Sequence, residues 1–190
     1  MTFMSKTKVL ALWRDEKMND DEARILRTPC AEIPAPFGPD SRRDIELLLE
    51  AFLEREDALG LAAPQIGVSR RVIAFRNRNF DKKGRVNNAE DCDVLINPRI
   101  TQARGEPVEG LEGCLSCPDL QMEIDRFPDI KVRALDRDGR KINRRYNDFL
   151  ARIVQHEMDH LDGKLIVDYE GAAYVPEKNK NFFDRLFKKE

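Results

Sequence analysis

The chain has 190 residues, with 41% hydrophobic and 36% charged residues, and its 33 Lys and Arg against 35 Asp and Glu give a formal net charge of −2. This length favours one domain and is enough to bury a core, while the composition excludes disordered and fibrous classes. The near-zero net charge gives no strong overall field, so we expect no direct binding to nucleic acid or to an anionic membrane.

No apolar run approaches the roughly 20 residues that a membrane helix needs. The segment before Trp13 lacks a signal-peptide pattern, because its apolar run is short and no small-residue cleavage site follows. We therefore expect a cytoplasmic protein whose four cysteines are thiols or metal ligands rather than disulfides. Nothing near Cys30 or Cys92 suggests ligation, so both are interpreted as ordinary thiols.

Residues 1–39 end in a proline-rich stretch and are interpreted as an N-terminal arm laid over the domain. A helix is predicted over residues 41–59, because apolar residues recur there at helical spacing and Gly60 follows as a stop signal. Ser41 followed by Asp44 resembles a capping box at its start.

The middle of the chain predicts strands and turns. Apolar or alternating runs predict strands at 71–75, 94–96 and 130–135. Residues 76–91 are charged and predict a long hairpin excursion between the first two strands. Asn97-Pro98 is predicted to close the second strand with a turn, and residues 136–139 (DRDG) supply another turn.

A second helix is predicted from about Asn147 to Asp162, with Gly163 as its C-terminal stop. Residues 176–190 predict a short amphipathic C-terminal helix or tail. We therefore expect one α+β domain over residues 1–190, with small antiparallel sheets packed around the helix at 147–162.

The segment Gln155–His160 (QHEMDH) on this helix carries the most informative pattern. Histidines at positions i and i+4 lie on one helix face, so His156 and His160 can bind one ion. Glu157 is placed to take a proton from an activated water. The match to His-Glu-x-x-His is complete and uses both of the chain's 2 histidines, which favours a metal site over two ordinary surface histidines.

A catalytic ion generally needs a third protein ligand and one open position. The candidates are two cysteines in the segment Glu-Gly-Cys-Leu-Ser-Cys-Pro and two downstream acids: Cys114, Cys117, Asp168 and Glu170. A thiolate is a strong ligand for zinc or iron, so we expect a cysteine near position 114. The residues by themselves leave the choice between the two cysteines open.

Cys114 and Cys117 also form a C-x-x-C pair, which allows a closed structural zinc site or a redox pair. The gap from Cys117 to His156 is far longer than in zinc fingers, and a closed site gives Glu157 no role. No βαβ pattern surrounds the pair, as a thioredoxin-like motif requires. A metallohydrolase is therefore the favoured interpretation.

Three segments resemble those of the peptide deformylases: GLAAPQ at 60–65, EGCLS at 112–116 and QHEMDH at 155–160. They occur in the order of that family, and a looser similarity runs from about Leu26 to Tyr169. The resemblance implies removal of the formyl group from the N-terminal methionine of newly synthesised chains, with release of formate. It also implies one divalent ion per chain, natively iron(II) and often zinc, nickel or cobalt in purified protein.

Position by position, the resemblance implies three metal ligands and one general acid/base: Cys114, His156 and His160, with Glu157. It thus selects Cys114 over Cys117.

The same resemblance implies that Gln65 and the backbone N–H of Leu115 hold the formyl oxygen as it becomes an oxyanion. It also assigns Gly60 and Gly113 to the substrate cleft. Taken without the family, Gln65 is equally a loop side chain that caps nearby backbone.

Several positions depart from the family pattern. Ala58 stands where another glycine is usual, and Gln121 lies near where an arginine is often found, with Arg126 further on. Arg152, one turn before His156, replaces an apolar residue of the methionine pocket. Either its stem packs while its head reaches solvent, or it reshapes or charges the pocket and so contacts substrate. The departures indicate a divergent member.

Three functions are therefore weighed: a peptide deformylase, a different amidase or peptidase using the same ion, and a non-catalytic zinc-stabilised or redox module. The expected partner is a formyl-methionyl peptide. The Lys- and Phe-rich C-terminal segment adds a transient ribosome contact as a hypothesis, beside its plain role as a helix packed on its own domain.

Overall fold

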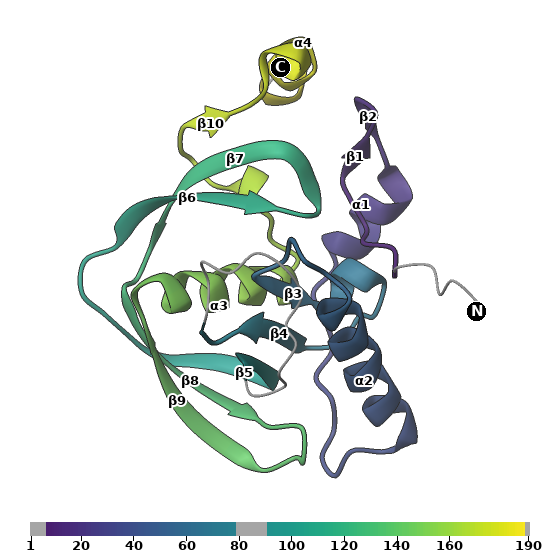
Figure 1. The fold of residues 1–190 in the computed structure, drawn as a ribbon, viewed down its shortest axis with the longest axis vertical. Helices are drawn as coiled ribbons and strands as arrows, with labels where there is room; N and C mark the ends of the chain where they lie inside the picture. The colour runs from purple at the N-terminus through teal and green to yellow at the C-terminus, as the bar shows by residue number, and fades with distance from the viewer. Residues whose placement is uncertain (1–6, 79–90, 189–190) are drawn as a thin grey trace.

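The computed structural model describes residues 7–78 and 91–188. Two antiparallel sheets lie on either side of helix α3 (Asp148–Leu161), as Figure 1 shows. The five-stranded sheet has the order β3 (Gly60–Ala62), β4 (Val72–Arg76), β5 (Cys92–Arg104), β8 (Asp129–Leu135), β9 (Lys141–Asn147). The three-stranded sheet has the order β10 (Ala173–Tyr174), β7 (Cys117–Arg126), β6 (Val108–Cys114). The predicted α+β class is confirmed.

Helix α3 matches its predicted range within one residue at each end. Gly163, just past the helix, has φ +73, the left-handed conformation that glycine adopts without strain. The apolar face of α3 packs on the five-stranded sheet, where Ala151, Val154 and Leu161 are fully buried. This packing holds the opposite face of α3 towards β6 and β7.

Helix α2 (Pro39–Leu53) differs from its predicted range at both ends. Proline occupies the first helical position, so Ser41 lies inside the first turn and caps nothing. The helix ends at Leu53, seven residues before Gly60, because the stretch at 54–57 (ERED) is polar and cannot continue the apolar stripe. Gly60 begins β3 instead of ending a helix.

The turn predicted at Asn97-Pro98 is wrong, since β5 runs through it. Asn97 has φ +51, and the pairing with β8 shifts register between Ile96 and Arg99, which is a bulge. The Asn97 side chain accepts from the Ile33 N–H at 2.8 Å and donates to the Ile33 carbonyl at 2.7 Å. The bulge therefore anchors the segment before α2 to the sheet.

The other strand predictions are confirmed. Strands β5 and β8 contain their predicted runs, and β4 lies one residue later than its predicted range of 71–75. The turn at 136–139 joins β8 to β9, with Gly139 at φ +81. The hairpin excursion predicted at 76–91 lies mostly outside the described residues.

The two ends of the described chain pack against each other. The N-terminal part holds β1 (Trp13–Arg14), β2 (Lys17–Met18) and α1 (Asp20–Leu26). The predicted C-terminal helix is confirmed as α4 (Lys180–Phe187). Trp13 makes edge-to-face contacts with Phe182 at 5.8 Å and Phe183 at 5.5 Å between ring centroids. The aromatic face of α4 is thus used inside the fold.

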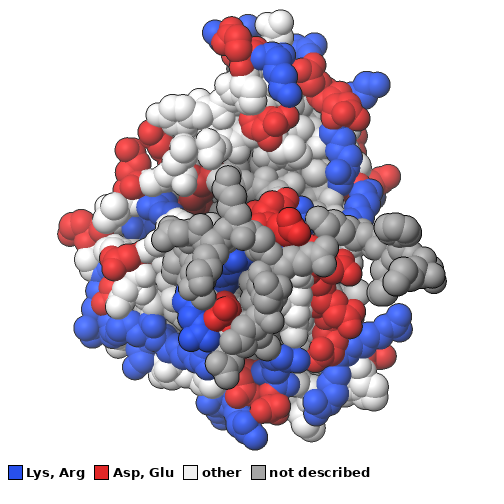
Figure 2. All heavy atoms as spheres, viewed as in Figure 1, with Lys and Arg blue, Asp and Glu red and all other residues white. Residues whose placement is uncertain are grey.

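Charged side chains of both signs are mixed over the face in Figure 2, with basic side chains gathered over β8 and β9. Many are paired across the surface, as in the ion pairs of Arg144 with Asp93 and of Arg145 with Asp129. Among residues 7–78 and 91–188, no helix combines the length and apolar character needed to cross a membrane. The prediction that residues 1–190 form one domain stays a prediction.

Candidate active site

Three possible metal ligands converge from two elements. Helix α3 supplies His156 and His160, and Cys114 lies at the end of β6. Their ligand atoms all lie within 4.8 Å of one another, and Cys114 Sγ is 3.3 Å from His160 Nε2. This is the only such group of three or more ligands among the described residues. Of the candidates for the third ligand, the structure brings Cys114 to the histidines, whereas the Asp168 carboxylate pairs with Arg27 at 2.9 Å.

The thiol chemistry of Cys114 suits a metal ligand. Its pKa is lowered well below the usual range by the hydrogen bond from the Cys117 thiol and by the neighbouring His160 and His156 imidazoles. Cys117 is fully buried beside it, and its own pKa is raised because it donates to that sulfur and is desolvated. A thiolate with two imidazoles is a donor set that fits zinc or iron(II).

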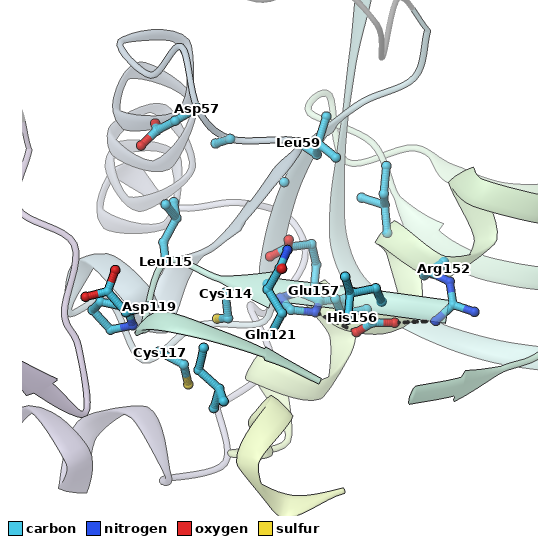
Figure 3. A pocket seen from close by; sticks show the side chains of 18 of the residues that line it. Asp57, Leu59, Cys114, Leu115, Cys117, Asp119, Gln121, Arg152, His156 and Glu157 are labelled. Carbon is cyan, nitrogen blue, oxygen red and sulfur yellow. Dashed lines mark hydrogen bonds and ion pairs between the residues drawn. The ribbon is translucent and has the colours of Figure 1, made fainter. Parts of the chain in front are cut away.

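Glu157 is buried next to these ligands, with 4% of its surface exposed. Burial raises the pKa of its carboxyl group to about 7, against the opposing effect of both histidines. Its Oε2 atom is buried and has no hydrogen-bond partner among the described residues. A buried carboxylate oxygen without a partner is rare and calls for a bound group or water. Figure 3 shows Cys114, His156 and Glu157 around one cavity of about 740 Å³.

Gly60 closes the site from the side of β3. A Cβ atom added at Gly60 would lie 2.3 Å from Glu157 Oε1 and 2.7 Å from Glu157 Cδ. The sequence interpretation as a helix stop missed this role, because the close approach arises only when β3 packs on α3.

Gly60→Ala is therefore expected to displace the Glu157 carboxylate. Overpacking at such a contact costs about 1–3 kcal/mol, and a displacement of about 1 Å at a catalytic group lowers kcat by roughly 10²-fold. Gly38→Ala is the matched control, since its added Cβ meets no atom of residues 7–78 or 91–188 within 4 Å. Thermal unfolding and kcat are measured for both variants. Equal melting temperatures and equal kcat values for Gly60→Ala and Gly38→Ala would contradict the expected displacement.

Gln65 and Leu115 line the same cavity. Gln65 follows β3 in the 3-10 helix η1 (Ala63–Ile66), and its Oε1 accepts from the Ala62 N–H at 2.9 Å. Its Nε2 donates to Ser116 Oγ at 3.1 Å and lies 3.9 Å from Cys114 Sγ. Leu115, in the turn after β6, lines the same cavity. Gln65 thus caps backbone and also points its amide nitrogen towards Cys114, one of the three possible metal ligands.

The N-terminal segment fixes these two loops by backbone contacts. The Leu10 N–H donates to the Gln65 carbonyl at 2.7 Å, and the Leu12 N–H donates to the Ser116 carbonyl at 2.9 Å. The segment therefore joins η1 to the turn between β6 and β7.

Glu112 is the functional candidate that the sequence analysis missed. It is buried on β6 and accepts from His156 Nδ1 at 2.9 Å, which leaves His156 Nε2 facing the other ligands. Arg126 donates to both Glu112 oxygens, at 2.9 and 2.8 Å, and also to Asp159 at 2.7 Å. Burial raises the pKa of Glu112, but the bonds from Arg126 and His156 outweigh it and lower the pKa to about 2. An orienting carboxylate of this kind fixes the tautomer of a ligating histidine.

A signal for Glu112 was present in the sequence. Residues two apart on a strand lie on the same face, so Glu112 shares a face with Cys114. The ion pair between Glu112 and Arg126 could not be predicted from the sequence, because it depends on the register between β6 and β7.

One expectation from the sequence was that the guanidinium group of Arg152 would reach solvent, but the structure buries most of the side chain. Its Nη1 donates to Glu112 Oε1 at 2.8 Å and to the Ile124 carbonyl at 2.7 Å, and its side chain is 13% exposed. A Cβ added at Gly110 would lie 2.7 Å from Arg152 Cζ. The arginine thus occupies space that a side chain at position 110 would fill, and it lines the cavity (Figure 3). Arg152 can adopt this position only because residue 110 is a glycine and has no side chain there.

The sequence profile of polypeptide deformylases matches residues 16–173. The chain belongs to the polypeptide deformylase family. It is 36% identical over 163 residues to peptide deformylase 1 of Bacillus subtilis (strain 168), covering 86% of this chain and 94% of that protein. It is 39% identical over 150 residues to a peptide deformylase of Alkalilimnicola ehrlichii, covering 79% and 77%.

Solved deformylase structures are similar over most or all of the chain. The Met-Ala-Ser-bound class I type b peptide deformylase of Acinetobacter baumannii has a TM-score of 0.67 at 32% identity, covering 85% of this chain and 99% of that chain. The actinonin complex of a peptide deformylase from Synechococcus elongatus has a TM-score of 0.70 at 28% identity, covering 100% and 89%. These relatives do not favour the alternatives of another amidase or a non-catalytic module.

Proposed function

We propose that this chain hydrolyses the N-formyl group from the N-terminal methionine of newly synthesised polypeptides and releases formate. The observation that carries the proposal is the convergence of Cys114, His156 and His160 beside a buried Glu157 carboxylate. The names of its relatives support it, and so does the Met-Ala-Ser peptide bound in the Acinetobacter baumannii structure. The proposal treats residues 1–190 as one domain of this kind.

The proposed metal ligands are Cys114, His156 and His160, holding one divalent ion. When bound, such an ion supplies Lewis-acid activation of water at neutral pH. We propose iron(II) as the native ion, with zinc, nickel or cobalt as substitutes in purified protein, since the Cys/His/His set suits all of these.

Glu157 acts as the general acid/base. Its raised pKa, about 7, lets its carboxylate take a proton from the attacking water and return it near neutral pH. The proton goes to the amine nitrogen of the methionine as the bond to the formyl carbon breaks. The Glu157 Oε2 atom supports this role, because it has no hydrogen-bond partner in the described part of the chain and can accept a proton.

Gln65 and Leu115 stabilise the formyl oxygen as charge develops on it. The Gln65 amide is held through its Oε1 by Ala62, so the orientation of its N–H groups is preset. The Leu115 backbone N–H is the proposed second donor, from the cavity wall.

The peptide backbone is proposed to lie between β3 and β6. Each of these is the edge strand of its sheet, and Gly60 and Gly113 line the cavity between them. Edge strands offer unpaired backbone groups to an extended peptide. The first side chain then lies against Phe149, Arg152 and Ile153 of α3, where Arg152 narrows the pocket from the side of β6.

The proposal is tested by formate release from formyl-peptides with freshly prepared, anaerobic iron(II) protein. Formyl-Met-Ala-Ser should release formate, and chelation should stop release without unfolding the domain, as for a catalytic ion rather than a structural one. A first-residue series of methionine, alanine and aspartate in wild type and Arg152→Leu checks the pocket assignment. No formate from any peptide would overturn the function, and an identical series in both proteins would remove Arg152 from substrate binding.

We also propose a cytoplasmic location with transient contact to ribosomes, because the proposed substrate is a nascent chain. Because Phe182 and Phe183 are buried against Trp13, any such contact would use the charged side of α4. Co-sedimentation with ribosomes at low and physiological salt checks this contact, and absence of co-sedimentation at both would count against it.

A further inference from the structure

Cys117 is a buried thiol beside the active-site cavity, and the proposed function gives it no role. It has no exposed surface, whereas Cys114, three residues earlier, is partly exposed at the same cavity. Figure 3 shows both side chains close to the turn that joins β6 to β7. A buried cysteine is often only a small apolar core residue, and its neighbours decide whether its sulfur can react.

The β6–β7 hairpin brings the two sulfur atoms together. Leu115 and Ser116 form the turn, and Cys114 lies directly opposite Cys117 in the register that follows the bulge after Gly113. Opposite residues of antiparallel strands have Cα atoms about 4.5–5.5 Å apart, and a disulfide spans about 4.4–6.8 Å between Cα atoms. The Cys117 thiol donates a hydrogen bond to the Cys114 sulfur. The pair is therefore placed to form a disulfide without a large backbone movement.

Contacts from outside the hairpin hold both cysteines in this position. The Leu12 N–H donates to the Ser116 carbonyl at 2.9 Å, and the Trp13 indole N–H donates to the Pro118 carbonyl at 3.0 Å. Cys117 also packs in the same core cluster as Trp13. Groups that are held in contact react as if at very high concentration, because no further ordering is needed.

The other two cysteines pack elsewhere. Cys30 lies in the core between the five-stranded sheet and α3, and Cys92 packs against the core beneath α2. Cys114 and Cys117 share a third core, beside the three-stranded sheet. Of the chain's 4 cysteines, all of which the structure describes, Cys117 is therefore the one that can reach an oxidised Cys114 sulfur.

We propose that Cys117 is a resolving thiol, which closes a reversible disulfide with Cys114 when a peroxide oxidises the active site. The Cys114 thiol attacks one oxygen of hydrogen peroxide, the O–O bond breaks, and a sulfenic acid and one water form. The Cys117 sulfur then attacks the Cys114 sulfur, and the hydroxyl leaves with the Cys117 proton as a second water. Two thiols are thus oxidised to one disulfide while one peroxide is reduced to two waters.

The disulfide removes a proposed metal ligand, because a thiolate binds a metal ion and a disulfide sulfur carries no such charge. The site is expected to release its ion until a thiol reductant restores both thiols. The disulfide also protects Cys114, since further oxidation to sulfinic and sulfonic acids is not reversed by thiols. This inference goes beyond the proposed function and uses only its assignment of Cys114 as a ligand.

The test treats the zinc-loaded full chain with an excess of hydrogen peroxide, because zinc has no redox chemistry of its own. Residues 105–126 form one tryptic peptide that carries both cysteines. In the wild type this peptide should lose two hydrogen atoms, and the chain should release its zinc. A thiol reductant should restore both thiols and zinc binding. In Cys117→Ser, Cys114 should proceed to the sulfinic and sulfonic acids, so zinc binding should stay lost after reduction.

Cys92→Ser is the matched control, since it makes the same substitution in another core and should behave as wild type. Thermal unfolding verifies the fold of each variant, and Cys117→Ala serves as a second variant without the buried hydroxyl. A wild-type peptide that keeps both thiols, or that gains oxygen instead, would overturn the inference.

Equal and irreversible loss of zinc binding in wild type and Cys117→Ser would overturn it as well. A disulfide formed with the zinc still bound would contradict both the metal release and the assignment of Cys114 as a ligand. None of these measurements uses formate release, so the outcome is independent of whether the chain hydrolyses formyl-peptides.

Discussion

Glu157→Gln is expected to lower kcat for formyl-peptide hydrolysis by roughly 10²–10⁴-fold, the range for loss of a general acid/base. The amide keeps the shape of the buried side chain but can no longer carry the proton from water to the leaving amine. The metal content should stay at one ion per chain, because the three proposed ligands are unchanged. Kinetics on formyl-Met-Ala-Ser together with metal analysis check both halves of this expectation.

Glu46→Gln is the matched control for this variant, since Glu46 forms a surface pair with Arg137 and is far more exposed than Glu157. It should change neither kcat nor metal content. If Glu157→Gln kept the wild-type kcat, the carboxylate would have no part in proton transfer. If it lost the metal, its effect on kcat would report a disturbed site instead.

Glu112→Gln is expected to have the largest effect on stability. The carboxylate is bonded to Arg126, Arg152 and His156, and its side chain is 5% exposed. Removing one partner of a buried ion pair leaves uncompensated charge and costs about 3–5 kcal/mol of unfolding free energy. For a chain of this size the melting temperature should fall by roughly 10 °C. Metal affinity should fall by about 10–100-fold, because His156 loses its orienting acceptor.

The pH dependence of stability gives a second readout of Glu112. Its pKa in the fold is about 2, below the ordinary value of 4.5, so its carboxylate stabilises the fold above about pH 4.5. That contribution is lost as the pH falls from about 4.5 towards 2. Metal-free wild type should therefore lose more stability over this window than metal-free Glu112→Gln. Parallel acid unfolding curves for the two proteins would argue against the assignment, and Glu46→Gln should follow wild type.

The sequence predicted the elements whose pattern is local. Apolar spacing placed α3 within one residue at each end, because a helical stripe and a glycine stop are features of neighbouring residues. It misjudged Asn97-Pro98 for the opposite reason, because Asn97 makes a bulge and its side chain bonds to Ile33, 64 positions away in the chain. The end of α2 was a local signal that was misread, since the polar residues 54–57 already interrupt the apolar stripe.

Within the site, the sequence by itself determined the chemistry of α3. The spacing of His156 and His160 follows from the helical repeat, and the resemblance of three ordered motifs added Cys114. Only the tertiary structure decided what surrounds them: Gly60 against Glu157, Glu112 behind His156, and Arg152 in the space beside Gly110. These contacts join residues 40 to 100 positions apart through the packing of two sheets on one helix. No local pattern encodes such contacts, since they depend on how the strands align and on which side chain fills which space.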